Sequence, residues 1–137
     1  MKLSSRTALI LASLCVSSLA AGCADGGPKL GQVSGTVTLD GQPLAPAKVE
    51  FQPQEAGGSP SYGTTDESGR YELTFSLDRP GAMIGKHLVR ITTYRQLSSQ
   101  DPGGPGELPE RVPPKYNANS ELIREVESGH NSFDFQL

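Results

Sequence analysis

The chain has 137 residues, with 12 Lys and Arg against 15 Asp and Glu, and its formal net charge is −3. This length suits one domain behind an export signal and leaves no room for two. Binding to nucleic acid requires concentrated Lys and Arg for phosphate contacts, and an acidic chain without a basic cluster lacks them. We therefore expect no nucleic acid among its partners.

The N-terminus has the pattern of an export signal. Lys2 and Arg6 give it a positive start, and residues 8–16 (ALILASLCV) form an almost unbroken apolar run. This run is too short for a membrane span, which needs about 20 apolar residues. It suits the core of a signal peptide instead. We predict a signal peptide over residues 1–22.

The signal ends in Leu-Ala-Ala-Gly-Cys, residues 19–23, which resembles a bacterial lipobox. The resemblance implies cleavage before Cys23 and acylation of that residue, so that lipid chains anchor the protein to a membrane of the cell envelope. Ala20 stands where leucine is commonest, which leaves ordinary signal-peptidase cleavage after Ala20 as the alternative. That cleavage would leave Cys23 as a lone thiol in an oxidising compartment. The next residue, Ala24, favours the outer membrane under the sorting rule of some Gram-negative bacteria.

Residues 23–31 are predicted to be a flexible tether to a domain over residues 32–137. The domain begins with two strands in which apolar and polar residues alternate, over 32–39 and 48–52. Asp40-Gly41 between them is a turn signal, because Gly tolerates positive φ.

Three more strands are predicted in the middle of the chain. Residues 61–65 suit a short edge strand, residues 71–76 alternate clearly, and residues 86–94 are rich in β-branched side chains. In the last of these, Val89, Ile91 and Thr93 are expected to face the core. Asp66 precedes the second and is expected to form an Asx turn rather than a calcium loop.

Residues 96–114 are crowded with Pro and Gly, show no periodicity and predict a long loop. Tyr94, Leu108 and Tyr116 flank its Pro-rich backbone. Extended Pro segments suit docking of a partner, so these three residues are the candidate partner-binding site. A mobile spacer is the alternative.

Two further β segments are predicted at the C-terminus. Residues 122–127 fit a strand or one helical turn capped by Ser120, and we favour the strand because Gly129 closes it. Residues 132–137 alternate again through Phe133, Phe135 and Leu137. Several short strands with regular turn signals and no long helix predict an all-β sandwich.

Two stretches carry longer motifs of turn and strand residues. They are Val33-x-Gly35-x-Val37-x-Leu39-Asp40-Gly41-x-Pro43-Leu44-x-x-Ala47-x-Val49-x-Phe51 and Thr65-Asp66-x-x-Gly69-x-Tyr71-x-Leu73. Together they resemble carboxypeptidase regulatory-like domains. The resemblance implies a seven-stranded Greek-key β-sandwich of the prealbumin-like (transthyretin-like) type, and many short bacterial lipoproteins resemble a single such domain. The shared residues are structural, so they imply a fold and no particular activity.

The residues present disfavour catalysis. His87 begins a strand and His130 falls in a turn over residues 128–131, without the paired spacing of a metal site. No Gly-x-Ser-x-Gly nucleophile elbow occurs in the sequence, and no cysteine remains for thiol chemistry. Glu107 and Glu110 are interpreted as solubilising loop residues. The basic residues Lys86, Arg90 and Arg95 are interpreted as a solvated strand face.

We therefore expect a non-catalytic, lipid-anchored accessory module of the cell envelope, with no cofactor, that binds a protein or glycan. Two alternatives stay open: a small enzyme on the same core, and a carrier of an apolar ligand. A sizeable cavity between the sheets would favour the carrier. A packed core with an ordered, protruding loop would favour the binding module.

Overall fold

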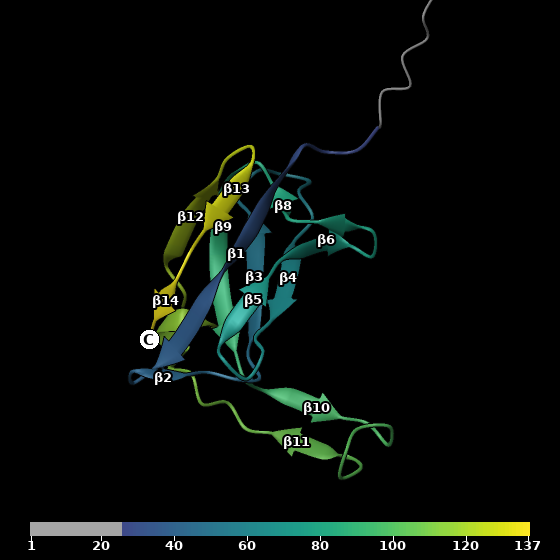
Figure 1. The fold of residues 1–137 in the computed structure, drawn as a ribbon, viewed down its shortest axis with the longest axis vertical. Helices are drawn as coiled ribbons and strands as arrows, with labels where there is room; N and C mark the ends of the chain where they lie inside the picture. The colour runs from purple at the N-terminus through teal and green to yellow at the C-terminus, as the bar shows by residue number, and fades with distance from the viewer. Residues whose placement is uncertain (1–25) are drawn as a thin grey trace, which may run out of the picture.

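The structure, a computed structural model, describes residues 26–137 and consists almost entirely of β-strands (Figure 1). The strands are β1 (Leu30–Leu39), β2 (Gln42–Pro43), β3 (Lys48–Pro53), β4 (Ser61–Thr64), β5 (Arg70–Glu72), β6 (Thr74–Ser76), β7 (Arg79–Pro80), β8 (Ala82–Met83), β9 (Gly85–Thr92), β10 (Arg95–Leu97), β11 (Gly106–Leu108), β12 (Leu122–Val126), β13 (His130–Ser132) and β14 (Phe135–Gln136). A single 3₁₀ turn, η1 (Pro114–Tyr116), is the helical element of the described residues. Within this part of the chain no helix has the length and apolarity that a membrane span requires.

The first sheet is centred on β1, the longest strand. β13 and β14 run parallel to β1 along one side, whereas β8, β5 and β2 run antiparallel along the other. Ser34 illustrates this arrangement, because it pairs with Ser132 on one side and with Glu72 on the other. β1 therefore joins the beginning, middle and end of the described chain in one sheet.

The second sheet is antiparallel and has the order β12-β9-β3-β4-β6-β7. At its centre Val49 lies opposite Ile91 and Phe51 lies opposite Val89. Alternate residues of a strand point to one face, so these four side chains form one apolar surface. All four are fully buried.

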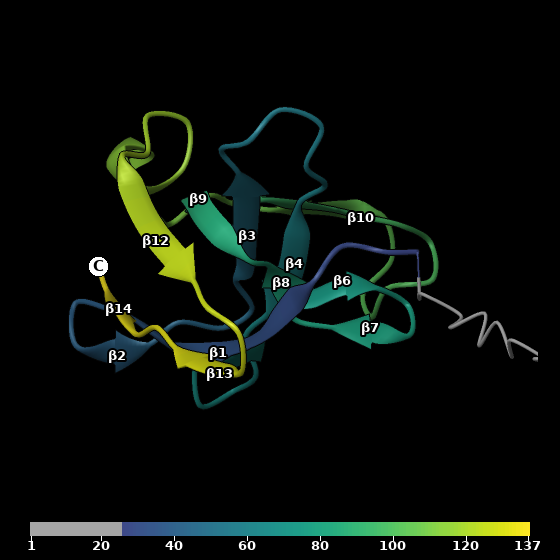
Figure 2. The ribbon, with the colours of Figure 1, turned by 90° about the horizontal axis from the view of Figure 1, so that it is seen from above.

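The apolar faces of the two sheets pack against each other as the two layers of a β-sandwich-like fold (Figure 2). The Phe51 ring of the second sheet lies 5.9 Å from the Phe133 ring and 6.4 Å from the Phe135 ring of the C-terminal segment. The core consists of buried Val33, Val37, Leu44, Ala47, Val49, Phe51, Tyr71, Leu73, Ala82, Val89, Ile91, Val112, Val126 and Phe135. Burial of this apolar surface is the main force that holds the sheets together. The predicted all-β fold and the predicted inner face of residues 86–94 are confirmed.

The strand predicted over residues 71–76 is divided between the two sheets. Tyr71 lies in β5, which pairs with β1, whereas Phe75 lies in β6, which pairs with β4 and β7. The chain crosses between the layers at Leu73, a buried residue whose N–H donates to the Val33 carbonyl and whose carbonyl accepts from the Gly81 N–H. The predicted alternation of buried and exposed residues is present, but a period of two does not indicate which sheet a residue joins.

Four features differ from the sequence prediction. The β segment predicted over residues 132–137 is divided between β13 and β14, with residues 133–134 outside both strands. β4 is not an edge strand, because it lies between β3 and β6. Leu30 and Gly31, predicted to be tether, already belong to β1 and pair with Met83 and Ala82. Residues 96–114 are not a featureless loop, because β10 and β11 pair there over three residues each. Strands of three residues are too short to show alternation. The predicted signal peptide and Cys23 lie outside the described residues.

Candidate functional site

The β10–β11 hairpin projects from one end of the sandwich (Figure 1). Its loop is closed by Asp101, whose carboxylate accepts hydrogen bonds from the Ser98 N–H at 2.7 Å and the Ser98 hydroxyl at 3.0 Å. The same carboxylate forms a 2.9 Å ion pair with Arg95 at the start of the hairpin. These hydrogen bonds and the charge of Arg95 lower the pKa of Asp101. The segment is therefore a paired hairpin whose loop is held by its own side chains.

Glu110 follows β11 and connects this end of the hairpin to the end of β9 through hydrogen bonds. Its carboxylate accepts from the Thr93 N–H at 3.0 Å, from the Val112 N–H at 2.9 Å and from the Thr92 hydroxyl. Partial burial opposes the charged form, but the hydrogen bonds from Thr92, Thr93 and Val112 outweigh it and lower the pKa of Glu110 to about 2. The interpretation of Glu110 as a solubilising residue was wrong, because the carboxylate binds the backbone.

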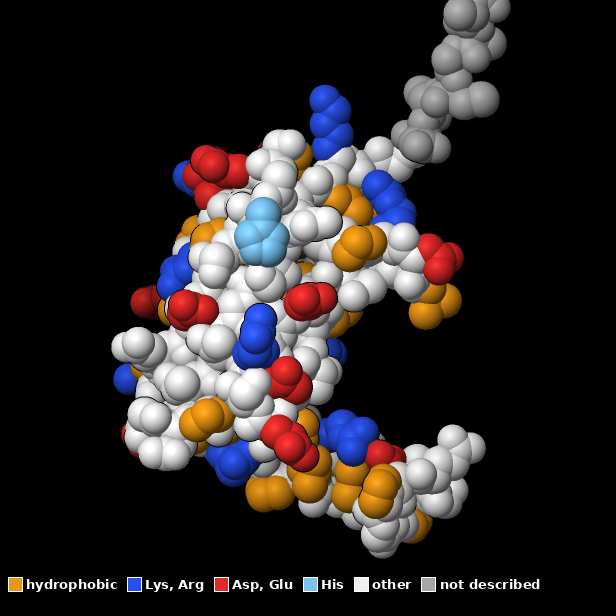
Figure 3. Space-filling view, in the orientation of Figure 1, with side chains coloured by type: hydrophobic (Ala, Val, Ile, Leu, Met, Phe, Trp, Pro, Cys, Tyr) orange, Lys and Arg blue, Asp and Glu red, His pale blue; other side chains and the backbone are white. Residues whose placement is uncertain are grey.

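A groove of about 360 Å³ lies between the base of the hairpin and the adjoining end of the second sheet. Figure 3 shows a hollow between the body of the molecule and the projecting hairpin. The groove is lined by Pro46, Lys48, Thr64, Thr92, Thr93, Tyr94, Arg95 and Leu108. It combines an aromatic ring, aliphatic surface, hydroxyl groups and two cations. Such a surface can hold an apolar group while hydrogen-bonding its polar neighbours. We call it the hairpin groove.

The three predicted partner-binding residues do not lie together. Tyr94 and Leu108 both line the hairpin groove, since Leu108 pairs with Arg95, the neighbour of Tyr94. The Tyr94 side chain is 47% exposed, and its hydroxyl lies 3.4 Å from a Glu107 carboxylate oxygen. Tyr116 lies in η1 and packs against the core. Only the first two residues therefore contribute to the hairpin groove.

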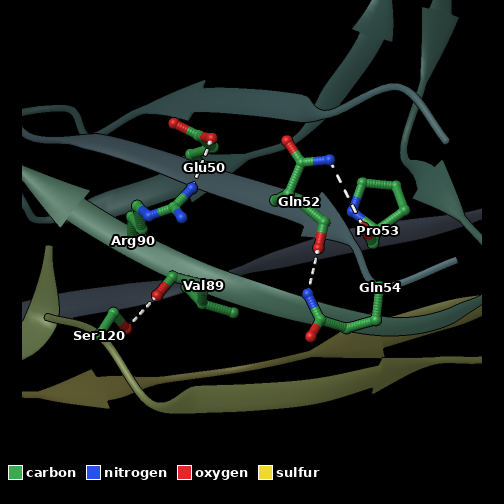
Figure 4. A network of polar contacts seen from close by, with 7 residues as sticks. All are labelled: Glu50, Gln52, Pro53, Gln54, Val89, Arg90 and Ser120. Atoms are coloured by element: carbon green, nitrogen blue, oxygen red, sulfur yellow. Dashed lines mark hydrogen bonds and ion pairs between the residues drawn. The ribbon is translucent and has the colours of Figure 1, made fainter. Parts of the chain in front are cut away.

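The basic residues Lys86 and Arg90 lie on the outer face of the second sheet. Arg90 forms a 3.3 Å ion pair with Glu50 on the neighbouring strand β3. Figure 4 shows this pair beside polar contacts that involve Gln52 and Gln54. Exposed pairs of this kind contribute little free energy. The arrangement fits the predicted solvated face rather than a cation patch for binding.

The two histidines lie in different places. His87 is fully buried between the sheets, with its ring 5.6 Å from that of Phe51 and its Nε2 2.6 Å from the Met83 carbonyl oxygen. Because a carbonyl oxygen can only accept a hydrogen bond, Nε2 carries the ring proton and its N–H donates to this oxygen. His130 is exposed, lies in β13 rather than in the predicted turn, and places Nε2 3.3 Å from the Ser34 hydroxyl. They share no site, and residues 26–137 contain no group of three His, Cys, Asp or Glu residues placed to hold a metal ion.

A second hollow, of about 800 Å³, lies on the outer face of the first sheet and was missed from the sequence. Two of its three carboxylates, those of Asp66 and Asp134, are bound by groups of the fold itself, whereas Glu72 is the third. Asp134 accepts from the Thr36 N–H at 2.8 Å, and Asp66 accepts from the N–H groups of Ser68 and Arg70 at 2.9 and 3.0 Å. The latter contacts confirm the predicted Asx turn, and the hydrogen bond from the Ser68 hydroxyl is the largest cause of the lowered pKa of Asp66. The polar lining of this hollow is therefore largely structural.

No protein-family model matches this chain, and no curated protein matches its sequence. Two solved structures resemble it. A 9R-lipoxygenase from Cyanothece PCC8801 is 18% identical with a TM-score of 0.44, and the match covers 80% of this chain and 16% of that one. A DUF3823 family protein from Parabacteroides merdae ATCC 43184 is 14% identical with a TM-score of 0.42, over 80% of this chain and 46% of that one. This chain spans less than half the length of either protein, and both similarities are too weak to indicate a family or an activity.

Proposed function

We propose that this protein is a lipid-anchored, non-catalytic module of the cell envelope that binds a protein or glycan partner through the hairpin groove. One observation carries the proposal: the described chain begins at one end of the sandwich, and the β10–β11 hairpin projects from the other (Figure 1). The eight residues of β9 connect the two ends and span about 26 Å at 3.3 Å per residue. An anchor at Cys23 would hold one end at the membrane and display the other.

The proposed anchor rests on the resemblance of residues 19–23 to a lipobox. The first fixed point of the described chain is Pro28, whose carbonyl accepts from Arg79 at 2.7 Å. The five peptide units from Cys23 to Pro28 reach at most about 17 Å when extended. More than one acyl chain on Cys23 would make the attachment effectively stable. Ala24 supports the outer membrane as the location.

The construction of the hairpin supports a binding role. Asp101 and Glu110 fix its loop and its base, so Tyr94 and Leu108 are held in position before a partner arrives. Preorganisation of this kind reduces the entropy that binding costs. Tyr94 offers a large ring with few rotatable bonds, a property that suits recognition of both protein and glycan surfaces.

We further propose that the sandwich is of the carboxypeptidase regulatory-like, prealbumin-like type with seven-stranded Greek-key topology. The two motifs that carry the resemblance are joined directly in space, which supports the assignment. The Thr65 hydroxyl accepts from the Ala47 N–H at 2.8 Å and donates to the Leu44 carbonyl at 2.6 Å. Gly35 is needed because a Cβ there would lie 1.9 Å from the Phe133 carbonyl oxygen.

Of the two alternatives, the apolar-ligand carrier finds less support than the binding module. Side chains from both sheets fill the space between them, and the hollows described above open at the surface. A small enzyme would need its reactive groups together. The buried position of His87 and the exposed position of His130 on the other sheet do not favour this.

Intact-mass analysis of the protein extracted from membranes tests the anchor. The expected mass corresponds to a chain that begins at Cys23 and carries acyl groups, and Cys23→Ser should abolish the added mass. An unmodified chain that begins at Ala21 would contradict the anchor.

Photo-crosslinking in cells tests the binding surface. A crosslinker in place of Tyr94, which is 47% exposed, should capture a discrete partner. The matched control replaces Ile123, which is 44% exposed and lies on β12. Equal capture from both positions would contradict a specific site at the hairpin groove.

A further inference from the structure

The β6–β7 hairpin presents an aliphatic side chain for which the fold gives no reason. Its register places Ser76 opposite Arg79, so Leu77 and Asp78 are its two turn residues. Leu77 is 100% exposed and contributes nothing to the core. Neither turn residue has positive φ, and turns ordinarily favour Gly, Pro or polar residues. The geometry of the turn therefore does not require a leucine.

This hairpin lies beside the point where the described chain begins. Arg79, at its base, donates to the Pro28 carbonyl at 2.7 Å. Lys29 and Ile84 continue the same surface, because the Ile84 N–H donates to the Lys29 carbonyl at 3.2 Å and the Ile84 side chain is 39% exposed. In both views the hairpin and the start of the chain lie on the same side of the molecule (Figures 1 and 2). We call Lys29, Leu77, Arg79 and Ile84 the exit patch.

We infer that the exit patch contacts the lipid bilayer, with Leu77 entering the interface between headgroups and acyl chains. This inference rests on the lipid anchor proposed at Cys23. Cys23 and Gly27 are four peptide units apart, and these units span at most about 14 Å. Gly27 lies directly against Arg79, since a Cβ on Gly27 would lie 2.3 Å from the Arg79 Nη1. An acyl chain on Cys23 therefore keeps Leu77 within reach of the membrane.

The chemistry of the exit patch fits a bilayer surface. Lys29 is exposed and carries a long apolar stem with a charged end, which lets it meet lipid phosphates while its stem stays near the acyl region. The Arg79 guanidinium holds the Pro28 carbonyl beside it. Asp78 stands beside Leu77, however, and the chain from Cys23 onward has 12 − 2 = 10 Lys and Arg against 15 Asp and Glu, a formal net charge of −5. The apolar side chains must then supply most of the contact. Membrane contact should occur on zwitterionic vesicles and change little with salt.

Fluorescence from two ends of the acylated protein tests the inference. The acylated protein is purified from membranes and reconstituted into phosphatidylcholine vesicles. Leu77→Cys then gives the acylated protein a single free thiol for an environment-sensitive fluorophore. Ser99→Cys, in the exposed loop of the β10–β11 hairpin, is the matched control. We expect a blue shift at position 77 and loss of intensity when the lipid chains carry spin labels, with neither effect at position 99.

Each other outcome overturns the inference in a distinguishable way. Water-like, unquenched emission at position 77 in protein whose mass shows acyl chains would overturn it and leave the anchor intact. Absence of acyl mass would overturn the anchor and the membrane contact together. A blue shift that occurs in native membranes but not in pure lipid vesicles would assign the exit patch to a protein partner instead.

Discussion

Two hairpins project from this sandwich, and they are held in different ways. β10–β11 has three paired residues per strand and a long loop over residues 98–105. Carboxylates secure it at two points, Asp101 in the loop and Glu110 at the base. β6–β7 has two residue pairs around an irregularity and a two-residue turn. It is secured at its base, where Arg79 binds the Pro28 carbonyl.

The difference follows from loop length. Ordering a longer loop costs more conformational entropy, and polar side chains that bind its backbone offset this cost. A two-residue turn needs no such hydrogen bonds, so the fold does not depend on its side chains. Tyr94 and Leu108 thus sit on a framework that Glu110 holds in position. Leu77 sits on a turn that does not depend on it, which makes these hairpins separable by mutation.

The largest expected effect comes from Glu110→Ala. It removes a charged acceptor shared by Thr92, Thr93 and Val112. Hydrogen bonds to charged groups contribute about 1.5–3 kcal/mol each when buried, and solvent screening at this mostly exposed carboxylate reduces the total loss to about 1–2 kcal/mol. Hydrogen exchange should lose protection in β10 and β11 while β3 keeps its protection. Glu110→Gln, which retains one acceptor oxygen, should lose less, and equal protection in all three proteins would contradict the role of Glu110.

Acid should release the same hairpin without mutation. The pKa of Glu110 is lowered from 4.5 to about 2. A lowered carboxyl pKa stabilises the fold fully above the ordinary value, and this contribution is lost as the pH falls from 4.5 through about 2. The Thr93 amide resonance should follow the transition. The pKa values of Asp66 and Asp101 are lowered too, so acid also protonates other carboxylates of the fold. Glu110→Gln is therefore the control, and in that variant the Thr93 amide resonance should not change over this pH range.

Arg79→Ala tests the smaller hairpin in the same way. The guanidinium donates to the Pro28 carbonyl and lies 5.5 Å from the Phe75 ring. Because this site is only partly buried, we expect a loss of about 0.5–1 kcal/mol. The loss should appear as faster exchange at Leu30 and Gly31, with no change at β10. Faster exchange at both hairpins would show that they are coupled and not separate.

The sequence predicted the parts of this fold that alternation controls. Side chains alternate between the core and the outer surface in β1, β3, β9 and β12, as the sequence predicts, because each strand has one buried and one more exposed face. Leu73 shows the limit, since its inward position fits the alternation while its neighbours join different sheets. Pairing partners are set by the packed sheets and not by local pattern.

The candidate site was only partly visible in the sequence for a related reason. Tyr94 and Leu108 were found because aromatic and aliphatic residues beside Pro-rich segments are conspicuous. The role of Glu110 depends on Thr92 and Thr93, 18 and 17 positions away, so no local signal marks it. Tyr116 looked equivalent to Tyr94, but η1 turns it onto the core. The exposure of a side chain at the end of a sandwich depends on the path that the chain takes back to the sheets. The spacing of residues in the sequence does not indicate that path.

Of these substitutions, Leu77→Ser should have the smallest effect on stability. A fully exposed side chain loses no buried area on substitution, so the free energy of unfolding should change by no more than about 0.5 kcal/mol. Leu108→Ser is the control in the other hairpin, where the half-buried leucine lines the groove and its loss should cost more. Urea unfolding of both variants measures this difference. If Leu77→Ser destabilises as much as Leu108→Ser, Leu77 serves the fold, and its exposure no longer argues for contact with lipid.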